Sequence, residues 1–184
     1  PHSSIPSRGR ASGEGVMHRV QGDLTWDGGH QLSGQFSGYT DNQSPFVFES
    51  TAQNGYSRFR VNIADTGDLM RTVFANTQMR SGTTTIDGVF TRDQIDATLR
   101  GERIRVRQIP ILAQLLTVGS LEGLSNTLTG EGIAFADYEL PVRYRMNDRL
   151  LFIKDGYAKG EALGINVWGT FDAKNNYVDY RGTL

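Results

Sequence analysis

The sequence feature that most constrains the fold is an alternation of apolar and polar residues with a period of two. It is clear in the first run, where Val20, Leu24 and Trp26 fall on one side and Arg19 and Asp23 fall on the other. Successive side chains of a strand point to opposite faces, so this pattern is typical of strands with one buried face. Because the pattern recurs to the end of the chain, we predict a mainly-β protein.

Two segments break this alternation and predict short helices. Residues 65–76 place Leu69, Val73 and Phe74 at helical spacing, and residues 109–128 are rich in leucine. We expect the second segment to plug or cap the sheet. The leucines expected to form this helical cap are Leu112, Leu115, Leu116, Leu121 and Leu124.

The domain organisation follows from length and local composition. Residues 1–14 are polar and contain two prolines and two glycines, so we expect a disordered lead or linker. Residues 15–184 are long enough for a single β-rich domain. Because the sequence begins at Pro1 and ends inside a strand-like run, we expect this domain to be a segment of a longer chain.

The apolar faces of the strands must be covered. We expect about ten to twelve strands, and two short helices cannot roof so many. The sheet must therefore close as a barrel or sandwich, or form an open groove filled by something apolar. We predict the open form, a curled antiparallel meander. Glycines such as Gly34, Gly88 and Gly169 lie among bulky residues on the apolar faces, where they leave room for a ligand or allow close backbone approach.

Several function classes lack support in the sequence. With 19 basic and 20 acidic residues the net charge is −1, which argues against nucleic-acid binding. There is no cysteine, and the three histidines, His2, His18 and His30, do not have metal-ligand spacing. No nucleophile elbow, dinucleotide fingerprint or phosphate-binding loop is present. We therefore assign no catalytic residue, metal or cofactor, and predict that the chain is not an enzyme.

A local run of arginines allows two interpretations. Arg100, Arg103, Arg105 and Arg107 are consistent with the solvated face of a strand. Clustered arginines also attract anionic lipid near a membrane, so Arg103, Arg105 and Arg107 are candidate contacts for lipid headgroups.

The C-terminal part of the chain resembles a known family. The resemblance is carried by QIPILAQLLTVGSLEGL at 108–124, GEGIAF at 130–135, GEALGINVWGTFD at 160–172 and DYRGTL at 179–184. These stretches resemble the AsmA-like C-terminal region. The resemblance implies a long, curled β-groove in the periplasm of a diderm bacterium, anchored in the inner membrane by a region outside this segment. It also implies a role in moving phospholipid between the inner and outer membranes.

We therefore expect a lipid-binding conduit that shields phospholipid acyl chains in an apolar β-groove, with other envelope proteins as further partners. The residues expected to line the groove are Trp26, Phe36, Val61, Leu99, Phe135, Val167 and Phe171. The alternative is a structural or interaction domain, a closed β-sandwich of an envelope protein without bound lipid. A glycan-binding or glycan-acting domain is a third interpretation, supported only by Trp26 and Trp168.

Overall fold

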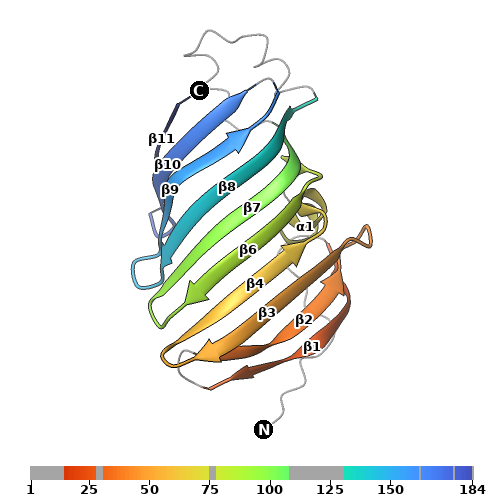
Figure 1. Ribbon diagram of the computed structural model, residues 1–184, viewed down its shortest axis with the longest axis vertical. Coiled ribbons are helices and arrows are strands. Elements are labelled where there is room, and N and C mark those ends of the chain that lie inside the picture. The colour runs from red at the N-terminus through yellow and green to blue at the C-terminus, as the bar shows by residue number, and fades with distance from the viewer. Residues whose placement is uncertain are drawn as a thin grey trace.

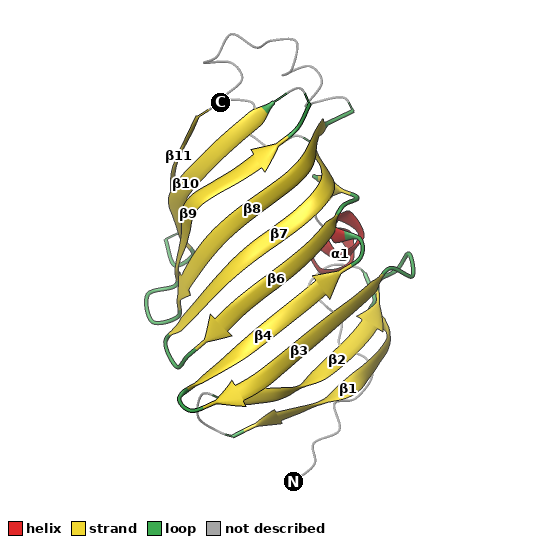
Figure 2. Cartoon of the chain, in the orientation of Figure 1, coloured by secondary structure: helices red, strands yellow, loops and turns green. Residues whose placement is uncertain are grey.

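The computed structural model describes residues 15–27, 31–74, 78–107, 131–161, 163–175 and 177–183. Over these residues the chain forms an antiparallel sheet of eleven strands with one short helix (Figures 1 and 2). The elements are β1 (His18–Trp26), β2 (Leu32–Tyr39), β3 (Pro45–Gln53), β4 (Tyr56–Ile63), α1 (Thr66–Phe74), β5 (Met79–Arg80), β6 (Thr83–Phe90), β7 (Gln94–Val106), β8 (Ile133–Arg145), β9 (Leu150–Lys159), β10 (Gly164–Asp172) and β11 (Tyr177–Thr183). The prediction of a mainly-β chain is confirmed.

The strands form a meander in which neighbours in sequence are neighbours in the sheet. The order is β1-β2-β3-β4-β6-β7-β8-β9-β10-β11, and the two-residue β5 pairs with β7 beside this path. Every pairing is antiparallel, so short turns suffice to connect most strands. The predicted antiparallel meander is therefore confirmed.

The sheet curls toward its apolar face without closing. Trp26 on β1 stacks on Phe90 of β6 with ring centroids 5.7 Å apart. These strands are four positions apart in the sheet, so about 19 Å would separate them if the sheet were flat. Leu32 also folds over the same face, because its amide donates to the Ser57 hydroxyl at 2.8 Å. The predicted curled, partly open sheet is confirmed. The alternative of a closed β-sandwich is wrong, because the strands of the described residues form one sheet that does not close.

Helix α1 packs behind the sheet near β4 and β6 (Figure 2). Asp65 caps its first turn by accepting from the Asp68 amide at 2.9 Å, as is common for a residue at this position. The hydroxyl of Thr66 lies 2.5 Å from that of Thr84 on β6. Thr84 in turn lies 2.5 Å from the hydroxyl of Tyr138 on β8. This buried chain of hydroxyls ties the helix to the apolar face, and α1 lies within the range 65–76 predicted to be helical.

A second polar anchor holds α1 to the turn after β2. Asp68 is 1% exposed and accepts hydrogen bonds from the side chains of Thr40 and Asn42 and from the Asn42 amide. Arg71 forms an ion pair with the same carboxylate at 3.2 Å. Burial raises the pKa of Asp68, but the hydrogen bonds from Thr40, Asn42 and Arg71 outweigh it and hold the pKa below its ordinary value.

The most buried part of the molecule lies at one end of β7 and β8. Its apolar residues are Ile104, Val106, Ile133, Phe135, Tyr138 and Leu163. Leu99 and Leu140 pack against this cluster although they are an odd number of residues from Ile104 and Phe135. On β7, Arg103 with φ of 54° interrupts the alternation, so that Leu99 and Ile104 on its two sides reach the same core.

Parts of the predicted organisation lie outside the described residues. They are the lead at 1–14 and the helical cap at 109–128, including Leu112, Leu115, Leu116, Leu121 and Leu124.

Replacing Asp68 tests the anchor of α1. Asp68→Asn removes a buried charge that accepts several hydrogen bonds, so we expect the free energy of unfolding to fall by about 1–3 kcal/mol. Urea denaturation at neutral pH measures this change. Asp23→Asn on β1, where the residue is exposed, is the control and should leave the unfolding free energy nearly unchanged.

The same carboxylate predicts a loss of stability in acid. Because folding lowers the pKa of Asp68 below 3.8, the unfolded chain takes up this proton first as the pH falls. Its stabilising contribution is therefore complete well above pH 3.8 and is lost as the pH falls through the lower folded-state pKa. Urea titrations along the pH axis should show a shallower acid loss in Asp68→Asn than in the native chain; parallel curves would contradict this assignment.

Candidate functional site: the apolar face of the sheet

A continuous row of apolar residues and glycines crosses the sheet from edge to edge. Its members lie opposite one another on successive strands, and they are Gly22, Phe36, Phe48, Val61, Ile86, Leu99, Leu140, Gly156, Val167 and Gly182. A bulge between Glu139 and Val142 shifts the register of β8 with β9. The Leu140 side chain nevertheless reaches the position that a Cβ at Gly156 would occupy. Four of the residues expected to line a groove, Phe36, Val61, Leu99 and Val167, lie in this row.

Phenylalanines stack over the N-terminal half of this face. Phe36 and Phe48 stack with ring centroids 5.0 Å apart, and Phe48 and Phe59 stack at 6.2 Å. Phe46 meets Phe36 edge to face at 6.1 Å. These contacts join β2, β3 and β4 and make a wide, apolar and largely rigid surface. Of this group only Phe36 was predicted to line the groove; the alternation in residues 46–48 and at Phe59 was the signal for the rest.

Glycines on this face do not leave open space. A Cβ added at Gly88 would lie 2.4 Å from the Phe59 ring, and one at Gly38 would lie 2.9 Å from the Phe46 ring. At Gly101 the ring of Tyr138 occupies the corresponding position. The glycines therefore let neighbouring aromatic rings lie flat across the strands, and the expectation that they make room for a ligand does not hold at these positions.

The remaining residues expected to line the groove lie elsewhere on the same face. Phe171 pairs with Leu151 and Val178 in a row nearer the end of the strands. Trp26 lies at the opposite edge, where it is 54% exposed despite stacking on Phe90. Phe135 is 2% exposed and belongs to the buried core instead of an open surface.

Solvent reaches much of the apolar face in the described part of the chain. Phe48, Val61, Ile86 and Leu99 are each only half-buried, although they lie in the central strands. Central-strand apolar side chains are usually fully buried, because the face that carries them packs against another layer. Helix α1 covers one end of the face, where Ile63 and Thr84 are buried. The middle of the face is therefore a broad apolar surface that remains accessible.

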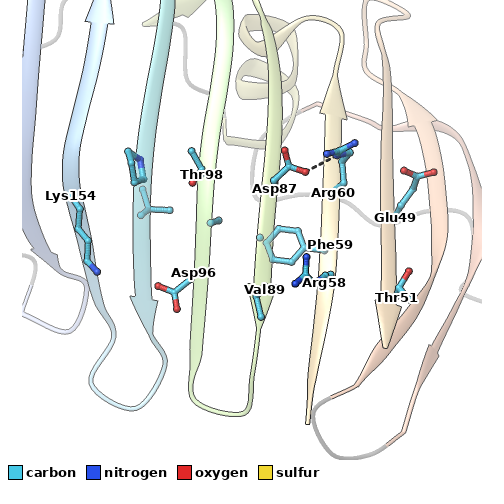
Figure 3. Close-up of a pocket in the computed structure, with 14 residues that line it drawn as sticks. Glu49, Thr51, Arg58, Phe59, Arg60, Asp87, Val89, Asp96, Thr98 and Lys154 are labelled. Carbon is cyan, nitrogen blue, oxygen red and sulfur yellow. Dashed lines mark hydrogen bonds and ion pairs between the residues drawn. The ribbon is translucent and has the colours of Figure 1, made fainter. Parts of the chain in front are cut away.

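The opposite face is charged, and cross-strand ion pairs organise it. Arg60 on β4 binds Asp87 on β6 at 2.6 Å (Figure 3). Arg143 on β8 binds Asp96 on β7, also at 2.6 Å. Arg100 and Glu139 form a third such pair at 2.9 Å. The hydrogen bond and charge of Asp87 raise the pKa of Arg60 above its ordinary value. In each pair the partners are directly opposite in the register, so the pairs favour this alignment of the strands.

A cavity of about 620 Å³ hollows this charged face between β3 and β9 (Figure 3). Arg58, Arg60 and Lys154 line it together with Glu49, Asp87 and Asp96. Basic and acidic side chains are balanced there, and Arg60 and Asp96 are already engaged in ion pairs. The composition of this hollow therefore does not select a ligand of one charge.

An arginine cluster lies at the end of β7, where the candidate headgroup contacts were placed. Arg80 on β5 is directly opposite Arg105, a juxtaposition of like charges that is unfavourable by itself. Arg105 donates to the Gly132 carbonyl at 3.2 Å, and the Nε of Arg107 is buried without a hydrogen-bond partner. Among the described residues, no ion pair is formed by Arg80, Arg103, Arg105 or Arg107. Arg80 could not be predicted as a member of this cluster, because it joins the cluster through a two-residue strand.

The described residues contain no cluster of three or more histidine, aspartate or glutamate side chains placed to hold a metal ion. His18, the one described histidine, instead lies 3.2 Å from the carboxylate of Asp41. Within the same residues, no helix has the length and hydropathy needed to cross a membrane.

Comparisons with known proteins identify no relative. No family model, curated protein or solved structure matches this chain.

The pairing of glycine with an aromatic ring can be tested at Gly38. Gly38→Ala forces the Phe46 ring to move, so we expect the free energy of unfolding to fall by about 1–3 kcal/mol. Urea denaturation should show that the same substitution costs less in a Phe46→Leu background, because the nearest clashing atoms are removed. Equal costs in both backgrounds would contradict the contact. The control is Gly164→Ala, because a Cβ added at Gly164 meets no atom within 4 Å. Gly55→Ala is not a suitable control, because Gly55 has φ of +85°.

Proposed function

We propose that this chain is a lipid-binding segment whose apolar face shields phospholipid acyl chains. The observation that carries the proposal is the apolar row from Phe36 to Val167, which crosses the sheet and is largely half-buried. A surface with this shape suits a long flexible hydrocarbon better than a compact polar ligand. The balanced charges of the opposite face suit contact with water.

The free energy available from such a surface is large. Each buried methylene group contributes about 0.8 kcal/mol, so even partial contact of one acyl chain favours binding. The row carries no charged residue, and its polar neighbours are short hydroxyls such as Ser50 and Ser57. Without a strong polar anchor, an acyl chain gains similar free energy at successive positions and can move along the row. This supports a conduit in which phospholipid slides.

The arginine cluster at Arg80, Arg103, Arg105 and Arg107 suits an anionic headgroup. Its like charges lack carboxylate partners among the described residues, so a phosphate would relieve their repulsion. The cluster lies at the end of β7 beside the buried core. We propose that it contacts headgroups at a membrane surface and that acyl chains lie on the apolar face.

The cellular setting is part of the proposal. The AsmA-like resemblance of the C-terminal stretches leads us to place the chain in the periplasm of a diderm bacterium, within an inner-membrane-anchored protein. In that setting it would carry phospholipid toward the outer membrane and would not catalyse a reaction. A second candidate is an interaction domain that binds another envelope protein on the same apolar face, since accessible apolar surfaces also mark protein interfaces.

Lipid occupancy tests the role of the apolar row. Val167→Arg places a charge in the row, so we expect phospholipid extracted from the purified chain to fall from near-stoichiometric to trace amounts by mass spectrometry. The matched control is Asn166→Arg, which adds the same charge to the opposite face of the same strand. A folded native chain without lipid, or equal lipid in both variants, would contradict the proposal and favour the interaction domain.

Phe171→Asp extends this test to the row nearer the strand ends. We expect it to reduce extracted phospholipid as well, with Thr170→Asp on the opposite face as its control. Circular dichroism of all four variants shows whether the β-content is retained.

Vesicle binding tests the arginine cluster separately. We expect the native chain to float with vesicles that contain phosphatidylglycerol and to bind pure phosphatidylcholine vesicles at least about tenfold more weakly. Arg80→Gln/Arg105→Gln should remove this preference while extracted lipid stays unchanged. Retained preference in this variant would contradict the role of the cluster, and Arg58→Gln on the charged face is the control.

A further inference from the structure

The ends of β1 and β2 leave the plane of the sheet and fold over its apolar face. The pairing of β2 with β3 stops at Gly34 and Ser50, whereas β1 and β2 stay paired as far as Trp26 and Leu32. Gly22 has φ of 149° and Gly34 has φ of 124°, backbone conformations that favour glycine, so both strands can bend at the same place. The strand ends beyond this bend, residues 23–26 and 32–33, form what we call the folded corner.

Short hydroxyl side chains hold the folded corner on the sheet. The Ser50 hydroxyl donates to the Leu32 carbonyl at 2.7 Å, and the Leu32 amide donates to the Ser57 hydroxyl at 2.8 Å. Ser50 is 7% exposed and Ser57 is fully buried. A larger side chain at either position would push Leu32 away from β3 and β4. The sequence therefore provides a seat for the corner in the middle of the apolar face.

Strand β6 is covered at both of its ends on the apolar face. At its beginning, the Thr84 hydroxyl lies 2.5 Å from that of Thr66 on α1, and Figure 1 shows α1 beside this end of β6. At its other end, Phe90 stacks on Trp26 of the folded corner. Helix α1 and the folded corner therefore approach β6 from opposite ends of the strand.

A passage across β6 remains between these two covers. Thr84 and Phe90 are six residues apart, which is about 20 Å along a strand. Ile86 and Gly88 lie between them on the same face and are half-buried, and the Phe59 ring lies beside Gly88. The passage thus has an apolar floor, with α1 as one wall and the folded corner as the other.

We propose that a phospholipid acyl chain crosses β6 through this passage and that Trp26 is the wall residue it contacts. This inference rests on the lipid-binding function proposed above and adds the route of the chain. The route continues on β7, because Ile86 lies directly opposite Leu99. A narrow flexible hydrocarbon fits between the two walls, whereas the broad face of a partner protein would have to displace α1 or Trp26. The indole of Trp26 is still 54% exposed after stacking on Phe90, so it retains apolar surface for this contact.

Quenching of tryptophan fluorescence by brominated lipid tests the contact. The chain has two tryptophans, so Trp168→Phe leaves only Trp26 and Trp26→Phe leaves only Trp168. Each variant is loaded from vesicles of phosphatidylglycerol with brominated or plain acyl chains and is then separated from the vesicles. Bromine quenches an indole that it touches, so brominated lipid should lower the emission of Trp26 at least about twofold. Emission of Trp168 should stay nearly unchanged, because Trp168 lies on the opposite face between Val167 and Gly169.

A charge placed in the floor of the passage tests the route. Ile86→Arg should lower the phospholipid extracted from the purified chain at least about tenfold, because a bound acyl chain would have to bury the charge. The matched control is Thr85→Arg, which adds the same charge to the opposite face of the same strand and should retain lipid. Circular dichroism shows whether both variants keep their β-content.

The outcomes separate the route from the lipid-binding function itself. Lipid that is retained in Ile86→Arg but lost in Val167→Arg would overturn the route and leave lipid binding in place. Bound brominated lipid that quenches neither tryptophan, or both equally, would overturn the contact with Trp26. A native chain that takes up no phospholipid from vesicles and carries none on purification would overturn both proposals.

Discussion

The structure depends on one constraint: a single antiparallel sheet must hold its shape although the other described residues cover one of its faces only in part. Helix α1 covers one end of the apolar face, and the compact core around Ile104 and Phe135 occupies the end of β7 and β8. Elsewhere the stabilising contacts are formed between strands of the same sheet. Phenylalanines stack across β2, β3 and β4, and the corner near Trp26 curls far enough to reach Phe90. The curl, the aromatic stack and the charged outer face all follow from this shortage of cover.

The two faces have different tasks. The inner face supplies apolar area, in which glycines such as Gly88 allow rings such as Phe59 to lie across neighbouring strands. The outer face favours the correct alignment of the strands, because the ion pairs Arg60–Asp87 and Arg143–Asp96 join residues that are directly opposite in the register. Exposed ion pairs contribute little free energy individually. In this sheet the ion pairs favour one register, because a shift of the strands would break them. The apolar rows alone would tolerate such a shift better than a closed core would.

Much of the fold could be predicted from local patterns, because strands with one apolar face repeat every second residue. The runs around Val61 and Leu99 alternate cleanly, and the helix at Thr66–Phe74 shows both its spacing and its Asp65 cap. Contacts between distant residues could not be predicted in this way. The stacking of Trp26 on Phe90, the position of Arg80 opposite Arg105 and the burial of Phe135 all depend on how far the sheet curls and where β5 returns. No periodicity encodes these features. The role of glycine could not be predicted either, because local sequence does not reveal that the Phe46 ring fills the space beside Gly38.

The meander order has a consequence for how the molecule comes apart. Strands on the path pair through their backbones with the strands before and after them, so cooperativity passes largely along the sheet from neighbour to neighbour, as in a repeat array. The pairing of β7 with β8 is long, with 13 residues in each strand, and lies beside the buried core. The outer strands β1 and β11 are shorter and more exposed. Unfolding should therefore be graded, with backbone amides of the two outer strands exchanging with solvent first and those of the β7–β8 pair protected longest.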